Sequence, residues 1–314
     1  MVIDDFGRSF KNLRISLLDV CNFACTYCTN EDLTSQQIKP NSLSVNDLLL
    51  TVQKLHAKLS LNSVRLTGGE PLLYPELEQL IAGLLEIGIP KVNMTSNGFL
   101  LEKKAIALRK AGLTEINISL DAAEEGSFFK MTRRAKLQEV KKGIDAAINA
   151  GLKVKLNAVL VRGENDDQVI PLLKYAASKN IAVRFLEVMQ MGHLYKESDE
   201  SLFSQQEILE RISTVYSFKA LPRKASATAN YWRTECGLIF GIIANTSTPF
   251  CKDCDRLRLD HHGNIFGCLS VNQPINLNTS NSDADFTTLL NSALNQKQPV
   301  KFTGSELPML KIGG

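Results

Sequence analysis

The sequence predicts an α/β protein that begins with an incomplete (β/α)6 TIM-like barrel and ends with a smaller C-terminal domain. Six short β-rich runs alternate with amphipathic helical stretches. Repeated strand–helix units build parallel sheets through right-handed crossovers. This regular alternation stops after about residue 200. We therefore expect a barrel domain over residues 1–220 and a second domain over residues 221–314.

The six predicted strands are rich in the apolar and β-branched residues that favour strands. They cover residues 13–18, 63–67, 91–95, 115–120, 153–160 and 181–187. In a barrel of this kind, ligands bind at the C-terminal ends of the strands. Three motifs directly follow predicted strands and should meet at one mouth: the cysteine loop from Cys21, Gly68-Gly69-Glu70-Pro71 and Thr95-Ser96-Asn97-Gly98.

Helical periodicity is clearest in two of the intervening stretches. Apolar residues three or four apart run from Leu48 to Leu59, after Ser44 as a plausible N-cap. A second stripe begins at Leu137 and ends before Gly151. A further helix is expected near residues 205–215. Residues 273–285, rich in Asn, Ser and Asp, indicate a surface loop.

Composition and charge narrow the class of protein. Of 314 residues, 44% are hydrophobic and 22% are charged, which is typical of globular domains. The net charge of +3 is too small to indicate nucleic-acid binding. No apolar run is long enough to span a bilayer, and no export signal is evident at the N-terminus. Seven cysteines in such a chain favour metal binding in the cytoplasm over disulfides.

Three cysteines lie in one short run, Cys21, Cys25 and Cys28, with the spacing C-x3-C-x2-C. Three thiolates can hold a 4Fe-4S cluster and leave one iron open to another ligand. Zinc in a structural site wants four ligands, and no fourth is nearby. Three thiols acting only as small buried hydrophobes are a weaker explanation for a polar loop.

A second set of three cysteines follows in the C-terminal part, at Cys251, Cys254 and Cys268. We prefer a second three-thiolate 4Fe-4S cluster, whose open iron would meet substrate. A structural zinc site with Cys236 as fourth ligand remains the alternative. The last part of the chain is thus expected to be an iron–sulfur domain that closes the open side of the barrel.

Arg256 and Arg258 follow this second set at alternating positions. Alternation places both guanidinium groups on one face of an extended segment, where they suit a polyphosphate. The competing interpretation is a solvated basic edge strand that discourages edge pairing.

The first cysteine run and Gly68-Gly69-Glu70-Pro71 resemble the signature motifs of the radical S-adenosylmethionine (SAM) superfamily. The resemblance implies that SAM chelates the open iron of the first cluster and that the second motif contacts its amino group. The segment Phe250–Leu259, together with Gly267-Cys268-Leu269, resembles the GTP 3',8-cyclase family of molybdenum cofactor biosynthesis. This second resemblance extends from Leu13 nearly to the last residue.

The family resemblance implies roles for particular residues. Substrate-binding residues would be Arg14, Arg65, Thr95, Lys155, Arg184, Arg256 and Arg258. SAM contacts would be Tyr27, Gly69, Ser119 and Met189. The resemblance also assigns catalytic roles to Arg256, Arg258 and the terminal Gly313 and Gly314, a tail expected to enter the active site.

The resemblance likewise implies an activity and partners. A 5'-deoxyadenosyl radical from SAM would abstract the 3' hydrogen of GTP, and ring closure at C8 would give (8S)-3',8-cyclo-7,8-dihydroguanosine 5'-triphosphate. A flavodoxin or ferredoxin would donate electrons, and cyclic pyranopterin monophosphate synthase would act downstream. A homodimer is plausible by the same analogy.

The chain departs from the family pattern at three places: Val20 before the first cysteine, Thr29-Asn30 after the third and Tyr74 after the glycine motif. These departures leave room for a relative with another nucleotide substrate. Two further alternatives are a radical SAM enzyme that modifies a peptide and a non-enzymatic iron–sulfur or zinc binding module.

Overall fold

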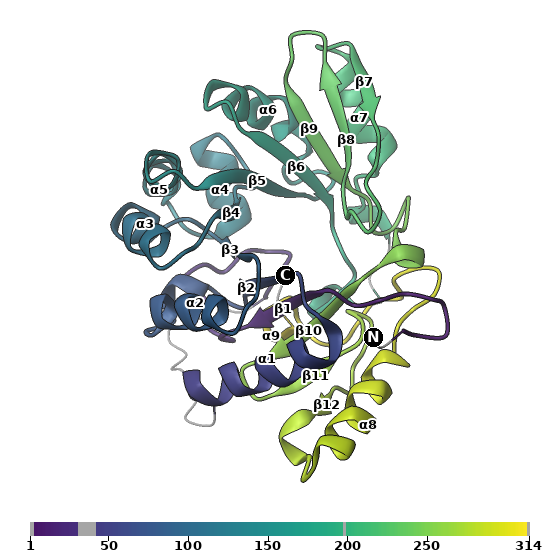
Figure 1. Ribbon diagram of the computed structural model, residues 1–314. Helices are drawn as coiled ribbons and strands as arrows, with labels where there is room; N and C mark the ends of the chain where they lie inside the picture. The colour runs from purple at the N-terminus through teal and green to yellow at the C-terminus, as the bar shows by residue number, and fades with distance from the viewer. Residues whose placement is uncertain (1–2, 31–41, 197–198, 313–314) are drawn as a thin grey trace.

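The computed structural model describes residues 3–30, 42–196 and 199–312, and its strands form one twelve-stranded sheet (Figure 1). The strands lie in the order β12-β11-β10-β1-β2-β3-β4-β5-β6-β9-β8-β7. Their bounds are β1 Asn12–Ser16, β2 Ser63–Thr67, β3 Val92–Ser96, β4 Glu115–Ser119, β5 Lys153–Leu160, β6 Ala182–Glu187, β7 Phe218–Leu221, β8 Asn230–Thr234, β9 Ile239–Ile243, β10 Arg256–Asp260, β11 Asn264–Phe266 and β12 Ile275–Asn276.

Strands β1 to β6 pair in chain order and in parallel, which confirms the predicted partial barrel. The helices pack along the outside of the curved sheet, except for the short last helix, which lies on its inner side against β1 and β10 (Figure 1). They are α1 Val45–Leu59, α2 Leu77–Glu86, α3 Leu101–Lys110, α4 Glu125–Thr132, α5 Leu137–Asn149, α6 Val169–Ser178, α7 Gln205–Ser213, α8 Asp283–Leu294 and α9 Met309–Ile312. The buried apolar faces of sheet and helices form the main core.

The two clearest helical predictions are confirmed in detail. The hydroxyl of Ser44 accepts a hydrogen bond from the backbone N–H of Asp47 and so caps α1. Leu48, Val52, Leu55 and Leu59 are buried against the sheet, as their spacing predicted. Helix α5 ends at Asn149, and Gly151 supplies the positive φ, +77°, at which the chain leaves the helix.

The segment after residue 217 is more regular than the sequence indicated, and it extends both edges of the six-stranded unit. Strand β9 pairs in parallel with β6, and β8 and β7 continue that edge in antiparallel fashion. Strand β10 pairs in parallel with β1 on the other edge, followed by β11 and β12. Both ends of the barrel sheet are therefore covered by strands from the last third of the chain.

The prediction of a surface loop over residues 273–285 is wrong. This stretch contains β12 and a 3-10 turn, and α8 begins at Asp283. Its polar residues serve as caps: the Ser282 hydroxyl accepts from the Asp285 N–H, and the Asn276 side chain accepts from the Asn278 N–H. Across the described ranges of the chain, no helix combines the length and apolar character needed to cross a bilayer.

Candidate active site

A cavity of about 480 Å³ lies at the C-terminal ends of the barrel strands, a size typical of small-molecule sites. Most of the residues that the sequence singled out line it: Arg14, Cys21, Cys25, Tyr27, Cys28, Arg65, Gly69, Thr95, Ser119, Arg184, Met189, Cys251, Cys254, Arg256, Arg258 and Cys268. The two cysteine sets, separated by more than 220 residues of chain, therefore face the same space.

Three predicted site residues do not belong to this group. Lys155 does not line the cavity, and its Nζ lies 3.8 Å from Oε2 of Glu115. Glu115 also accepts a hydrogen bond of 2.6 Å from Lys91. Its single carboxylate is therefore the counter-charge of both Lys91 and Lys155. Gly313 and Gly314 lie outside the described residues.

Backbone contacts between the glycine motif and the segment before Cys21 fix the first cysteine loop. The N–H groups of Gly69 and Glu70 donate to the carbonyls of Leu18 and Val20, at 2.6 and 2.9 Å. A Cβ on Gly69 would lie 1.9 Å from the Val20 oxygen, so only glycine fits there. The contact uses the backbone of residue 20, which explains why Val20 is compatible with this loop.

Glu70 connects the glycine motif to the loop after β3. Its buried carboxylate accepts from the Leu72 N–H, the Asn97 N–H and the Ser96 hydroxyl, at 3.0, 2.7 and 2.8 Å. Burial nevertheless raises the pKa of Glu70 to about 7. Asn97 in turn donates to Asn22 at 2.7 Å, beside the first cysteine. Glu70 thus holds two of the three strand-end motifs in one arrangement.

The three cysteines of the first loop are half-buried and line the same part of the cavity. Burial raises the pKa of Cys21 and of Cys28 to about 12 and also raises the pKa of Cys25, with Glu70 as the next cause for Cys21 and Asp121 as the next cause for Cys25. Three such thiols become thiolates readily only when cations bind them. Cys21 already accepts a hydrogen bond from the Phe23 N–H at 3.4 Å.

The second loop carries its own positive charges. Cys254 accepts hydrogen bonds from Lys297 Nζ at 3.3 Å and from an Arg256 guanidinium nitrogen at 3.5 Å. Burial would raise the pKa of Cys254, but Lys297 and Arg256 together lower it. Burial raises the pKa of Cys251 to about 11, with Cys268 and Cys254 as neighbours.

The donor chemistry fits two 4Fe-4S clusters better than a zinc site. Among the described residues, no three Cys, His, Asp or Glu side chains converge closely enough to hold a single metal ion. A 4Fe-4S cluster needs no such convergence, because each thiolate binds a different iron. Cys236, the fourth ligand of the zinc alternative, is exposed and in hydrogen-bonding contact with the Thr234 hydroxyl at 3.1 Å.

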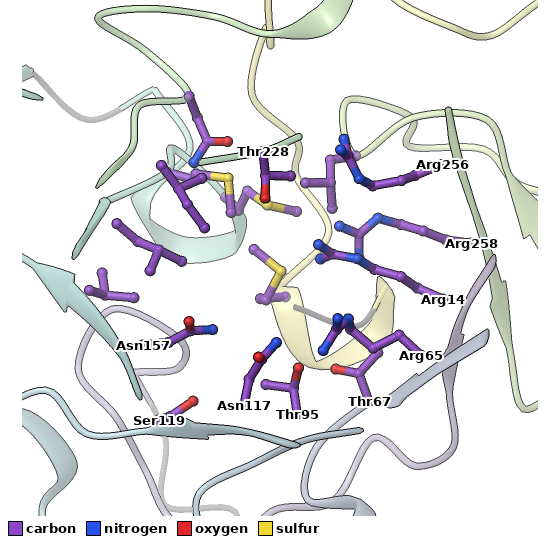
Figure 2. A pocket seen from close by; sticks show the side chains of 18 of the residues that line it. Arg14, Arg65, Thr67, Thr95, Asn117, Ser119, Asn157, Thr228, Arg256 and Arg258 are labelled. Carbon is purple, nitrogen blue, oxygen red and sulfur yellow. The ribbon is translucent and has the colours of Figure 1, made fainter. Parts of the chain in front are cut away.

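Four guanidinium groups lie one beside another on one wall of the cavity, those of Arg14, Arg65, Arg256 and Arg258 (Figure 2). Arg14 pairs in register with Arg65 on β2 and with Arg258 on β10. Burial lowers the pKa of Arg65 and of Arg258 to about 10, and it lowers that of Arg14 as well, with Arg258 as the next cause.

No carboxylate in the described part of the chain forms an ion pair with Arg14 or Arg258. Buried cations without a carboxylate partner call for an anionic ligand, because burial of an uncompensated charge is costly. This wall is therefore an anion-binding surface, and the interpretation of Arg256 and Arg258 as a solvated edge strand is wrong: β10 lies between β1 and β11, and Arg258 is buried.

Helix α9 brings the C-terminal end of the chain to the same wall. The Ser16 hydroxyl donates to the Leu310 carbonyl at 3.3 Å, and Arg258 donates to the Ile312 carbonyl at 3.4 Å. Met309 and Leu310 line the cavity, and Ile312 is buried. The last described residue is thus held beside the arginine group.

Several cavity residues escaped the sequence analysis. Asn117 and Asn157 line the wall formed by β4 and β5 (Figure 2), and Asn157 accepts two hydrogen bonds from Arg184, at 2.9 and 2.6 Å. The sequence pattern that could have identified both asparagines is a polar residue at an inward-facing position of a strand. Thr228 and Lys297 also line the cavity, but nothing in their local sequence marked them.

Comparison with known proteins agrees with this geometry. The family model of the radical SAM superfamily matches residues 15–176, and the model described as Molybdenum Cofactor Synthesis C matches residues 181–302. The GTP 3',8-cyclase of Synechocystis sp. is 34% identical, with coverage of 90% of this chain and 85% of that protein. The GTP 3',8-cyclase of Staphylococcus carnosus is 37% identical, with coverage of 85% and 81%.

Solved structures share the fold at low identity. Streptococcus suis SuiB bound to the precursor peptide SuiA has a TM-score of 0.66 at 16% identity, with coverage of 88% of this chain and 64% of SuiB, less than two thirds of its length. Native anSMEcpe with bound AdoMet has a TM-score of 0.64 at 14% identity, with coverage of 90% and 81%. These likenesses concern the fold alone. The relatives at 34% and 37% identity, together with the two family models, show that the chain belongs to the GTP 3',8-cyclase family of the radical SAM superfamily.

Proposed function

We propose that this chain uses SAM and two 4Fe-4S clusters to convert GTP to (8S)-3',8-cyclo-7,8-dihydroguanosine 5'-triphosphate, the first step of molybdenum cofactor biosynthesis. Family membership supports the reaction. The observation that carries the residue assignment is the anion-binding wall of arginines between two three-cysteine loops in one cavity. The two sets, Cys21, Cys25 and Cys28, and Cys251, Cys254 and Cys268, are the proposed cluster ligands.

The chain's own groups divide the work of binding. Bound at the first loop, the cluster and SAM supply the 5'-deoxyadenosyl radical that takes the 3' hydrogen of GTP. Tyr27, Gly69, Ser119 and Met189 are the proposed SAM contacts, and all four line the cavity. Tyr27 is oriented by its hydrogen bond to Asp121, at 3.0 Å. No side chain needs to act as a nucleophile, because the protein contributes binding, orientation and exclusion of water.

The substrate residues are proposed to hold the two ends of GTP. The guanidinium groups of Arg14, Arg65, Arg256 and Arg258 suit the charge of the triphosphate. Thr95 and Arg184 line the same cavity and complete the proposed wall. Lys155 stays a proposed substrate residue by family resemblance alone, because Asn157, two residues further along β5, lines the cavity and Lys155 does not.

The wider setting rests on analogy and composition. We propose that a flavodoxin or ferredoxin donates the electron, that cyclic pyranopterin monophosphate synthase consumes the product and that the enzyme forms a homodimer in the cytoplasm. Seven cysteines, all free in the described structure, suit a reducing compartment. The division near residue 220 also stays a proposal; it falls within β7, and the strands that follow extend both ends of one shared sheet.

The test is anaerobic incubation of the reconstituted protein with reductant, SAM and GTP, followed by chromatography for 5'-deoxyadenosine and for the cyclised nucleotide. ATP and inosine triphosphate in place of GTP serve as controls for the base. Product from GTP alone supports the proposal. Formation of 5'-deoxyadenosine without any cyclised guanine nucleotide would instead indicate another substrate, and zinc in place of iron at the second loop would contradict the second cluster.

A further inference from the structure

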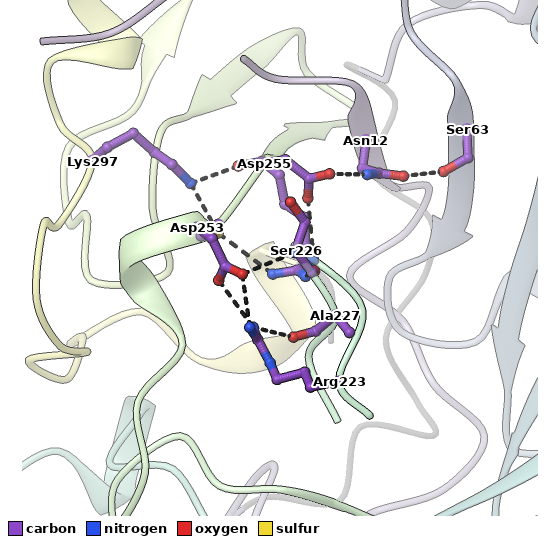
Figure 3. Close-up of polar contacts among 10 residues, drawn as sticks. Asn12, Ser63, Arg223, Ser226, Ala227, Asp253, Asp255 and Lys297 are labelled. Atoms are coloured by element: carbon purple, nitrogen blue, oxygen red, sulfur yellow. Dashed lines mark hydrogen bonds and ion pairs between the residues drawn. The ribbon is translucent and has the colours of Figure 1, made fainter. Parts of the chain in front are cut away.

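Lys297 is a buried cation beside the second cysteine loop, and its surroundings identify what it pairs with. The side chain follows the end of α8, and the residue is 7% exposed. Its Nζ donates to Cys254 Sγ at 3.3 Å and to the Arg256 carbonyl at 2.7 Å (Figure 3). It also lies 5.3 Å from the centre of the Phe10 ring. Lys297, Cys254 and Arg256 all line the cavity.

The local structure holds this ammonium group in place. The Lys297 N–H donates to the Leu294 carbonyl at the end of α8, and the Gln296 side chain accepts from the Gly267 N–H at 3.3 Å, next to Cys268. A Cβ on Gly267 would lie 1.9 Å from the Ala293 carbonyl oxygen, so the helix end packs directly on this loop. Lys297 is therefore presented by a backbone that also positions a cluster ligand.

Arg8 fixes the same place from the N-terminal side. One of its guanidinium nitrogens donates to the Cys251 carbonyl at 2.8 Å and to the Gln298 carbonyl at 2.9 Å. Its charge is compensated by Asp4, at 2.7 Å. Lys297 differs, because no ion pair joins it to a carboxylate within the described ranges. A buried ammonium in this position needs another source of negative charge.

We propose that Lys297 is a positioning residue for the second 4Fe-4S cluster, in which its ammonium group is the counter-charge of the Cys254 thiolate and raises the reduction potential of the cluster. A hydrogen bond to a ligating sulfur and a nearby positive charge both stabilise the reduced state, which carries one more negative charge than the oxidised state. The inference rests on the assignment of Cys251, Cys254 and Cys268 as cluster ligands. The spectrum of the unsubstituted protein tests that assignment separately.

Lys297 differs from Arg14, Arg65 and Arg258 in that it donates to a cysteine of the second loop, a contact that it shares with Arg256. Two of the three ammonium protons are used by Cys254 and by the backbone of Arg256. We therefore expect Lys297 to affect the reaction through the second cluster. The measurable effect is a change in the reduction potential of that cluster. A residue that only packed against Phe10 would leave the potential of the cluster unchanged.

The experiment is an anaerobic redox titration followed by electron paramagnetic resonance. It compares the unsubstituted holoenzyme with Lys297→Met, Lys297→Arg and Lys301→Met, the last of which removes an exposed lysine four residues away. A full-length background in which Cys21, Cys25 and Cys28 are all alanine isolates the second cluster. Circular dichroism and iron content check the fold and the loading of each variant.

We expect Lys297→Met to shift the ratio of reduced to oxidised cluster at a fixed potential about tenfold toward the oxidised form, which is a shift of about 59 mV for one electron. Lys297→Arg should keep the reduction potential close to that of the unsubstituted protein, and Lys301→Met should leave it unchanged. Loss of the second cluster from the Met variant, with retention in the Arg variant, would also support the proposal. A wild-type potential in a fully loaded Met variant, or loss of the cluster from both variants, would overturn it.

Discussion

Asp253 receives two hydrogen bonds from the guanidinium group of Arg223, at 2.7 and 2.9 Å, across 30 positions of sequence. Arg223 also donates to the Ala227 carbonyl at 2.6 Å, and Asp253 accepts from the Ser226 N–H at 2.9 Å (Figure 3). The pair therefore connects residues 226–228, which line the cavity, to the loop between Cys251 and Cys254.

From this pair we expect Arg223→Ala to raise the KM for GTP several-fold, because the loop that lines the cavity loses its anchor. The pair is partly exposed, so its loss should cost only about 1 kcal/mol of stability. A cycle with Asp253→Asn should show coupled, non-additive effects on KM. Additive effects of the two substitutions would mean that the pair does not hold the loop.

Cys25→Ser should abolish SAM cleavage and leave roughly half of the iron, because a hydroxyl is a poor ligand for this iron site and the second loop is untouched. Cys236→Ser is the matched control, since Cys236 is exposed and lies outside both sets. Iron analysis and chromatography for 5'-deoxyadenosine check the result. A Cys25→Ser protein that still makes 5'-deoxyadenosine would refute the assignment of the first loop.

Arg256→Ala and Arg258→Ala should each weaken turnover of GTP by about 1.5–3 kcal/mol, the range for hydrogen bonds to charged groups. SAM cleavage without product should survive better than cyclisation, because neither side chain belongs to the first loop. Arg233→Ala, which removes an exposed arginine of β8, is the control. Unaltered kcat/KM in both cavity variants would remove these arginines from the substrate site.

Deletion of Gly313 and Gly314 should lower cyclisation by orders of magnitude while SAM cleavage and both clusters remain, since correct positioning alone is worth several kcal/mol. Arg258 donates to the Ile312 carbonyl, which in the shortened chain becomes the terminal carboxylate and keeps residue 312 beside the cavity. An anaerobic assay that follows both products checks this. Full product yield from the shortened chain would show that the two glycines are dispensable.

Glu187→Gln should lower the free energy of unfolding by about 1–3 kcal/mol. The buried carboxylate accepts from the backbone N–H groups of Gln205, Thr246 and Ser247, at 2.9, 2.9 and 3.0 Å, and an amide must turn its NH₂ group toward one of these donors. Anaerobic urea unfolding of the loaded protein measures the change. Exposed Glu235→Gln is the control, and equal stability of both variants would contradict the prediction.

The sequence predicted the barrel well because each of its strands and helices has its own periodic signal. Residues 63–67 and 153–160 are strands as expected, since their alternation is local. Strand β7 gave no such signal: it has four residues, and Lys219 and Ala220 are exposed. Its stability comes from pairing with β8, which is a tertiary effect that local propensity does not report.

For the cavity, spacing revealed the cysteines and alternation revealed the two arginines of β10. Contacts between residues far apart in the sequence could not be predicted, because no local pattern marks them. Lys297 meets Cys254 across 43 positions, and a single lysine after a helix is usually a solvated side chain. Alternation also did not separate Lys155 from Asn157, because both lie on one face of β5 and only Asn157 lines the cavity.

The parallel pairing of β1 with β10 has a consequence for how the protein is made. Asn12 is opposite Arg256, so one edge of the first strand stays unpaired until about 240 further residues have left the ribosome. At ~5–20 residues per second, this delay is on the order of 10–50 s. During that time Arg14 lacks its neighbour on β10, and the cysteine loop that follows β1 has no complete cavity around it. The cavity, with both cysteine loops in its wall, is therefore complete only after β10 and Cys268 have been synthesised.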